Sequence, residues 1–155
     1  MPSGASRNQT LAPADDIVRM FDRAAERARD RVIVLSPAWR TTAGHLDDWS
    51  REAAARVGAA ALAPGSIVGL VAASGPAFLA GFLGLRRAGC TALLLDVTAA
   101  TADRARVLDA IGASALLFCD VDARATHFAA KLERLANPRA VDPRPDWAVI
   151  QMTGK

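Results

Sequence analysis

The stretch that decides the fold runs from Ile67 to Asp96 and reads IVGLVAASGPAFLAGFLGLRRAGCTALLLD. Its first nineteen residues, Ile67 to Leu85, carry no charge, which is also typical of a membrane-spanning helix. Ser74-Gly75-Pro76 interrupts that run, because proline lacks an N–H and suits the first turn of a helix better than its middle. The interruption therefore favours three shorter elements over a membrane span: a strand over Ile67–Ala72, a helix over Pro76–Ala88 and a strand over Thr91–Leu95.

Both strands are continuously apolar, which is typical of strands covered on both faces. A helix joins them, so we expect a parallel pair with a right-handed crossover. The pattern then repeats: Thr101 is a candidate cap for a helix that ends at Gly112. The inner face of that helix is predicted to be Ala105, Leu108 and Ile111. The later elements are predicted to be a third parallel strand over Ala115–Cys119; a helix over Asp122–Ala136, buried through Ala125, Phe128, Ala129 and Leu132; and a strand over Trp147–Met152. The predicted fold class is α/β, an open, mostly parallel sheet with helices on both faces.

The residues before Ile67 add two helices and a hairpin. Residues 1–12 are predicted to be a disordered lead-in, and residues 13–155 to form one α/β domain. Thr42 is predicted to cap the second helix, which runs to about Ala60. The elements are a helix from Pro13 to near Asp30, buried through Ile17, Met20, Phe21 and Ala24; a hairpin of Val32–Leu35 with Trp39–Thr42; and a helix buried through Leu46, Trp49, Ala53 and Val57.

Composition argues against several classes of function. The 155 residues are 52% hydrophobic and carry a net charge of +3, with 19 basic residues scattered among 16 acidic ones and no Tyr. This pattern does not indicate a nucleic-acid surface. Cys90 and Cys119 form no CxxC motif, so we expect buried thiols in a cytoplasmic protein, and the first residues do not suggest a signal peptide.

No set of side chains in the sequence indicates a catalytic or metal site. His45 and His127 are the only histidines, and we interpret both as structural, since metal sites need three or four clustered ligands. The pairs Asp15/Asp16 and Asp47/Asp48 are interpreted as first-turn acids that interact with a helix dipole. We therefore name no catalytic residue and no metal ligand.

Several motifs, taken in order, resemble those of adenylate-forming enzymes, the superfamily of acyl-CoA synthetases, luciferases and nonribosomal peptide synthetase adenylation domains. The stretch from Phe82 to Asp96 is similar to the family motif FLGxLKAGAxxVPLD, although both prolines around the aspartate are absent here. Val149-Ile150-Gln151-Met152-Thr153 resembles the lead-in to the family phosphate loop, T-S-G-[ST]-T-G-x-P-K. Weaker similarities lie at Thr41–Leu46 (LTYxEL), Pro64–Leu70 (GDRVAL) and Ala105–Asp120 (RLxxxLxxSGAKxLxxD).

The resemblance implies an N-terminal subdomain of such a ligase, ending at the start of the phosphate loop. The implied reaction joins a carboxylic acid to ATP, with Mg²⁺, to give an acyl-adenylate, and then transfers the acyl group to the thiol of CoA or a carrier protein. The implied nucleotide-binding residues are Thr153, Gly154 and Lys155. The expected partners are the remainder of the ligase, or a second copy bound through an exposed apolar face.

Two functional hypotheses follow. In the first, the chain is a segment of an adenylate-forming ligase that is inactive alone, because the other ATP and acyl contacts of the family have no counterpart here. In the second, it is a stand-alone α/β module for binding or interaction, without catalysis.

Overall fold

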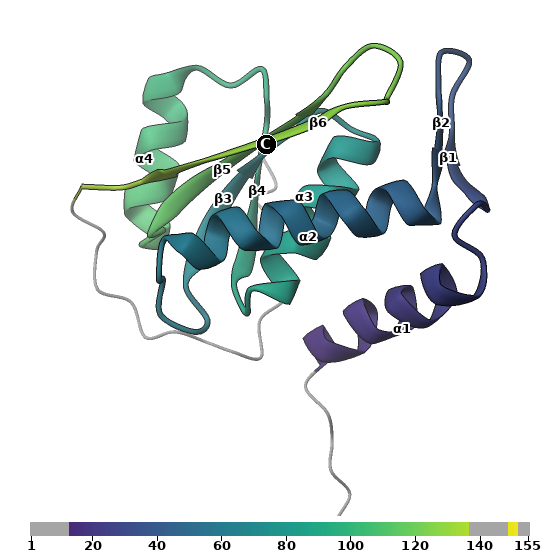
Figure 1. Ribbon diagram of the computed structural model, residues 1–155. Coiled ribbons are helices and arrows are strands. Elements are labelled where there is room, and N and C mark those ends of the chain that lie inside the picture. Colours follow the sequence, from purple (N-terminus) through teal and green to yellow (C-terminus); the bar gives the residue numbers. More distant parts are fainter. Residues whose placement is uncertain (1–12, 137–148, 152–155) are drawn as a thin grey trace, which may run out of the picture.

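The computed structural model describes residues 13–136 and 149–151 and shows an α/β architecture (Figure 1). In chain order the elements are α1 (Pro13–Arg27), β1 (Val32–Leu35), β2 (Arg40–Thr42), α2 (Ala43–Ala59), β3 (Ile67–Val71), α3 (Pro76–Arg87), β4 (Thr91–Leu95), α4 (Thr101–Ile111), β5 (Ala115–Val121), β6 (Phe128–Arg134) and β7 (Val149–Gln151). The predicted strands and helix between Ile67 and Leu95 are confirmed to within a residue.

The main sheet has the strand order β6-β5-β3-β4-β7. Strand β3 pairs in parallel with β4 and with β5, and β4 pairs in parallel with β7. Only β6 runs antiparallel, against β5. The sheet is therefore mostly parallel, as the continuous apolar strands predict.

Helices cover both faces of this sheet. From β3 the chain crosses to β4 on one side through α3, and from β4 it returns past β3 to β5 through α4. Two right-handed crossovers in opposite directions place their helices on opposite faces. The contacts agree: a Cβ added at Gly81 of α3 would meet Leu70 and Cys119, whereas one added at Gly69 would meet Leu108 of α4. Figure 1 shows α4 on one side of the sheet and α2 and α3 on the other.

Helix α2 packs against α3 at very close range. A Cβ built at Gly84 would lie 2.5 Å from the Cβ of Ala53 and 2.9 Å from the carbonyl oxygen of Ser50. The predicted buried stripe of α2, which is Leu46, Trp49, Ala53 and Val57, is confirmed, with exposed fractions of 8% or less. Thr42 caps α2 as predicted, because its hydroxyl accepts a hydrogen bond from the backbone N–H of His45.

The prediction of a helix over Asp122–Ala136 is wrong, since residues Phe128–Arg134 form strand β6. Phe128, Ala130 and Leu132 pack against the core, while the residues between them are exposed. These residues therefore fit the alternation of a strand as well as they fit the spacing of a helix. The edge of β5 would otherwise be unpaired, and it favours the strand because it supplies hydrogen-bonding partners for the backbone. Ala125, expected on a helix, has a φ of 51° in the connecting turn.

Four smaller predictions are also wrong. In α1 the stripe is rotated: Ala25 is buried, while Ile17 and Met20 are 43% and 70% exposed, because α1 contacts α2 and α3 through another face. In α4, Leu108 is buried as predicted but Ala105 is exposed, and Thr101 is the first helical residue rather than the cap. Asp47 and Asp48 lie beyond the first turn of α2.

Other expectations are confirmed. Val32–Leu35 and Arg40–Thr42 form the predicted hairpin, and Gly112 ends α4 in the left-handed conformation. Cys90 and Cys119 are buried free thiols. Among the described helices, none has both the length and the hydrophobicity that crossing a membrane requires.

Candidate functional site at the carboxyl edge of the sheet

The carboxyl ends of β3, β4, β5 and β7 lie along one edge of the sheet, since these four strands are parallel. The chain leaves β3 toward α3 on one face and leaves the neighbouring β4 toward α4 on the other. In open α/β sheets, ligands bind at such a switch point, outside the carboxyl ends of the strands. The topology thus makes this edge the candidate site.

The loop after β3 is shaped by Gly75. Its φ of 123° favours glycine, and a Cβ at this position would lie 3.1 Å from the indole ring of Trp39. Pro76 follows as the first residue of α3, whose N-cap has no side chain to occupy the free N–H groups of the first turn. The loop therefore presents backbone N–H groups near the sheet edge, beside an aromatic side chain from the hairpin.

The loop after β4 is held by Asp96. Its Oδ1 accepts hydrogen bonds from both the backbone N–H and the hydroxyl of Thr98, each at 2.7 Å. The Thr98 backbone N–H, and then its hydroxyl, hold the pKa of Asp96 below the ordinary value for aspartate. Asp96 is thus ionised at neutral pH, and the hydrogen bonds from Thr98 order the turn.

A turn between β5 and β6 is organised in the same way by Asp122. Its Oδ1 accepts from the backbone N–H of His127 at 2.7 Å and of Thr126 at 2.6 Å, while the Thr126 hydroxyl donates to Oδ2 at 2.7 Å. The His127 backbone N–H, followed by the Thr126 hydroxyl, lowers the pKa of Asp122 far below its ordinary value. The turn fixes where β6 begins.

A cavity of about 470 Å³ lies at this edge, over the ends of β3, β5 and β6. Most of its lining is apolar, and its polar groups are Cys119, Asp120 and Lys131. Burial raises the pKa of the Cys119 thiol to about 12, so this side chain is not a nucleophile at neutral pH. The sequence does not indicate this cavity, because its pattern predicts a helix around Lys131, whereas the pairing of β6 with β5 brings Lys131 to the edge.

The sequence-predicted nucleotide-binding residues Thr153, Gly154 and Lys155 lie outside the described residues. The described chain comes closest to them at Gln151, the last residue of β7, which pairs with Leu94 two positions before Asp96. His45 is exposed, and its ring stacks on Trp49 with centroids 5.6 Å apart, while His127 lies in the Asp122 turn. The structure therefore brings neither histidine to a common centre.

The described side chains do not fit a magnesium site. Magnesium prefers several oxygen ligands in octahedral geometry, often including carboxylates. Within residues 13–136 and 149–151, no three His, Cys, Asp or Glu side chains gather closely enough to hold a metal ion. We therefore derive no chemical step through Mg²⁺ bound to these residues.

The comparisons with known proteins agree on one family. The family model described as AMP-binding enzyme matches residues 21–152. A curated relative, naringenin synthase from Pestalotiopsis fici, is 33% identical over 110 residues, which are 71% of this chain but only 4% of that protein.

Solved structures resemble the chain over a similar stretch. One is the nonribosomal peptide synthetase FmoA3 in an AMPPNP-bound form, with 26% identity and a TM-score of 0.62 over 70% of this chain and 12% of that one. Another is the N-terminal subdomain of Klebsiella oxytoca NpsA in complex with 3-hydroxyanthranilyl-AMSN, with 25% identity and a TM-score of 0.59 over 70% of this chain and 28% of that one. The family match spans most of the sequence, and this chain belongs to the AMP-binding enzyme family of adenylate-forming ligases.

Proposed function

We propose that this chain is the N-terminal segment of a ligase that activates a carboxylic acid with ATP, and that it is inactive without the rest of such an enzyme. The observation that carries the proposal is the family match over residues 21–152, which ends beside Thr153. The small shares covered, 4% of the curated relative and 12% and 28% of two solved chains, support a segment that contributes one part of a larger site.

In the complete ligase, the proposed reaction is attack of the substrate carboxylate on ATP, giving an acyl-adenylate and pyrophosphate. The acyl group then passes to the thiol of CoA or of a carrier protein. Thr153, Gly154 and Lys155 would meet the phosphates through a hydroxyl, backbone N–H groups and an ammonium. Magnesium would arrive with ATP, and we assign it no ligand among the described residues. We place this chemistry in the cytoplasm, where thiols stay reduced.

The described part of the chain supplies positioning rather than catalysis. It orders the loops after β3 and β4, through Gly75 and Asp96, at the edge that Gln151 of β7 approaches. It offers no general base with an adjacent nucleophile and no metal cluster. An adenylating site must hold both substrates in line and exclude water, which needs groups beyond these.

Carboxylate-dependent exchange of labelled pyrophosphate into ATP tests this proposal. The purified chain is incubated with Mg-ATP, labelled pyrophosphate and a panel of fatty, aryl and amino acids, and we expect no exchange above background. Exchange that follows the chain through purification and disappears in Lys155→Ala would overturn the inactive-segment proposal. The DNA after codon 155 supplies an independent test, because an in-frame continuation that lacks the later parts of a ligase would contradict it.

We also propose that the isolated chain self-associates. Met20 of α1 and Leu35 of β1 are 70% and 69% exposed, and Val32 and Ile33 of the same strand are exposed as well. Val32, Ile33 and Leu35 lie on one strand of the hairpin, and an exposed apolar strand of this kind is a contact surface for another protein chain. Light scattering should show species larger than a monomer that shift toward the monomer in Leu35→Glu. A monomer at high concentration in the unmodified chain would refute it.

A further inference from the structure

The two faces of the sheet are covered unequally. On one face, α3 packs against β3, β4 and β5, and α2 packs against β6. On the other face α4 covers the middle of the sheet, with Leu108 against Leu95 and Leu116. Beside α4, the side chains of β5 and β6 are left partly open, and a cavity of about 290 Å³ lies between the helix and these strands.

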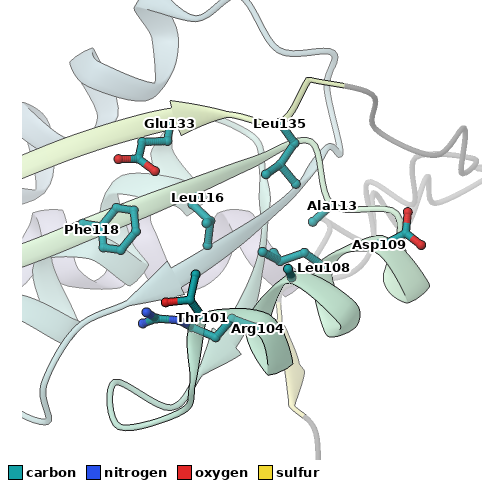
Figure 2. A pocket seen from close by; sticks show the side chains of 10 residues that line it. Thr101, Arg104, Leu108, Asp109, Ala113, Leu116, Phe118, Glu133 and Leu135 are labelled. Atoms are coloured by element: carbon teal, nitrogen blue, oxygen red, sulfur yellow. The ribbon is translucent and has the colours of Figure 1, made fainter.

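The walls of this cavity are apolar and come from three elements. Figure 2 shows Leu108 of α4 facing Leu116 and Phe118 of β5, with Leu135 closing the wall after β6. Ala105 and Ala113 complete the apolar lining. An apolar cavity of about 150 Å³ is enough to bind benzene. A cavity nearly twice as large can therefore hold an apolar ligand group of roughly ten heavy atoms.

The polar groups of the cavity are distributed unevenly. Thr101 and Arg104, in the first turn of α4, lie at one end, and Asp109 lies at the other (Figure 2). Glu133 also lines the cavity, and its carboxylate accepts a hydrogen bond from Lys131 at 2.6 Å. The backbone N–H of Arg104 bonds the carbonyl oxygen of Ala100, but its guanidinium makes no hydrogen bond or ion pair with the described residues and is available at the rim. The neighbouring Arg106 is instead paired with Asp103.

We propose that this cavity, which we call the α4 cavity, binds a small molecule with an apolar body and one carboxylate. The body lies between Leu108 and Phe118, and the carboxylate is bound by Arg104 and the hydroxyl of Thr101. The orientation follows from charge, because Asp109 at the opposite end repels an anion, whereas the charge of Glu133 is already compensated by Lys131. A planar guanidinium is well suited to a carboxylate, since it donates two parallel hydrogen bonds.

This proposal does not rest on the adenylating function. The α4 cavity lies along the face of the sheet, and binding there requires neither ATP nor Thr153, Gly154 or Lys155. If the exchange assay overturns the proposed function, the proposal for the α4 cavity still stands. If the α4 cavity binds no carboxylate, the proposed function still stands.

Titration of the ¹⁵N-labelled chain with octanoate, followed by NMR, tests the proposal. We expect saturable shifts at the amides of Leu108, Leu116, Phe118 and Leu135. Octanol and octylamine, with the same chain and a neutral or cationic head, should bind more weakly. Octylamine binding more tightly than octanoate would overturn the assigned chemistry, and no saturable shift with any of the three at millimolar concentration would overturn the site.

Matched variants locate the site and the head group. Ala105→Trp fills the cavity from an exposed helical position and should abolish the shifts, whereas Ala110→Trp, exposed on the same helix outside the lining, should leave them intact. Arg104→Gln should weaken octanoate about tenfold, the lower end for a charge-assisted hydrogen bond, without changing octanol binding. Arg106→Gln should change neither. Dispersed spectra confirm that each variant is folded, and equal losses in Arg104→Gln and Arg106→Gln would overturn the role of Arg104.

Discussion

Arg87 of α3 donates a hydrogen bond to Asp47 of α2, with its Nη2 atom 2.9 Å from Oδ1 of the carboxylate. The same guanidinium also bonds Asp22 of α1 and, through Nε, the hydroxyl of Ser50. Both partners are largely buried, with exposed side-chain fractions of 10% for Arg87 and 9% for Asp47. The Arg87 guanidinium thus connects three helices, α1, α2 and α3, through residues that are far apart in the sequence.

Asp47→Asn should therefore destabilise the chain strongly. It removes a charge that compensates Arg87 and that also pairs with Arg29 and Arg51. Arg87 keeps Asp22 as a second carboxylate partner, so we expect the loss of its charge-assisted hydrogen bond to Asp47 to cost about 1.5–3 kcal/mol in the free energy of unfolding. Urea denaturation of the variant and the unmodified chain measures this difference in the free energy of unfolding. The matched control is Asp103→Asn, whose exposed pair with Arg106 should contribute almost nothing. Equal losses in the two variants would show that Arg87 and Asp47 do not act as a buried pair.

Two glycines on neighbouring helices should respond to alanine in opposite directions. Gly84→Ala places a Cβ against Ala53 and the backbone of Ser50, so α2 and α3 must separate, at a cost of about 1–3 kcal/mol. A Cβ at Gly58 meets no atom within 4 Å, so Gly58→Ala should stabilise α2 by about 0.5–1 kcal/mol. Thermal unfolding of both variants measures the difference, and a neutral Gly84→Ala would refute the close approach of the helices.

The two thiols should be inert in the folded chain. Burial raises the pKa of Cys119 to about 12 and also raises the pKa of Cys90, so at pH 8 both stay protonated as well as inaccessible. A chromogenic disulfide reagent at pH 8 should label neither thiol in buffer and both in concentrated urea. Rapid labelling of the native chain, before any loss of secondary structure, would contradict the burial of both side chains.

Acid should weaken the β5–β6 turn through Asp122. Its folded-state pKa is depressed by the His127 and Thr126 donors, so its contribution to stability is fully present above the unfolded value of about 4. That contribution is lost as pH falls below about 4 through the folded-state pKa. Asp122→Ala should lower the urea midpoint at pH 7, and the gap from the unmodified chain should narrow at pH 3. A gap that is the same at both pH values would show that the carboxylate charge has no part in the turn.

The strands and helix of the central unit could be predicted because their information is local. The charge-free run from Ile67, its break at Pro76 and the return of apolar residues at Thr91 indicate strand, helix and strand without knowledge of any partner. The same holds for Thr42, whose capping role depends only on the next three residues. The family resemblance rests on this stretch as well, and the family match confirms it.

Residues 122–136 and the clusters that join helices were decided by tertiary structure. Phe128, Leu132 and their neighbours fit both a helical and a strand pattern, and pairing with the edge of β5 selects the strand. The strand β6 then forms part of the wall of two cavities, the one lined by Lys131 and the α4 cavity beside Phe118. Likewise, Arg87 suits the end of a helix in the sequence, but its partner Asp47 is known only once α2 lies against α3. Local spacing determines secondary structure where one pattern fits, whereas burial against a distant partner decides between patterns that fit equally well.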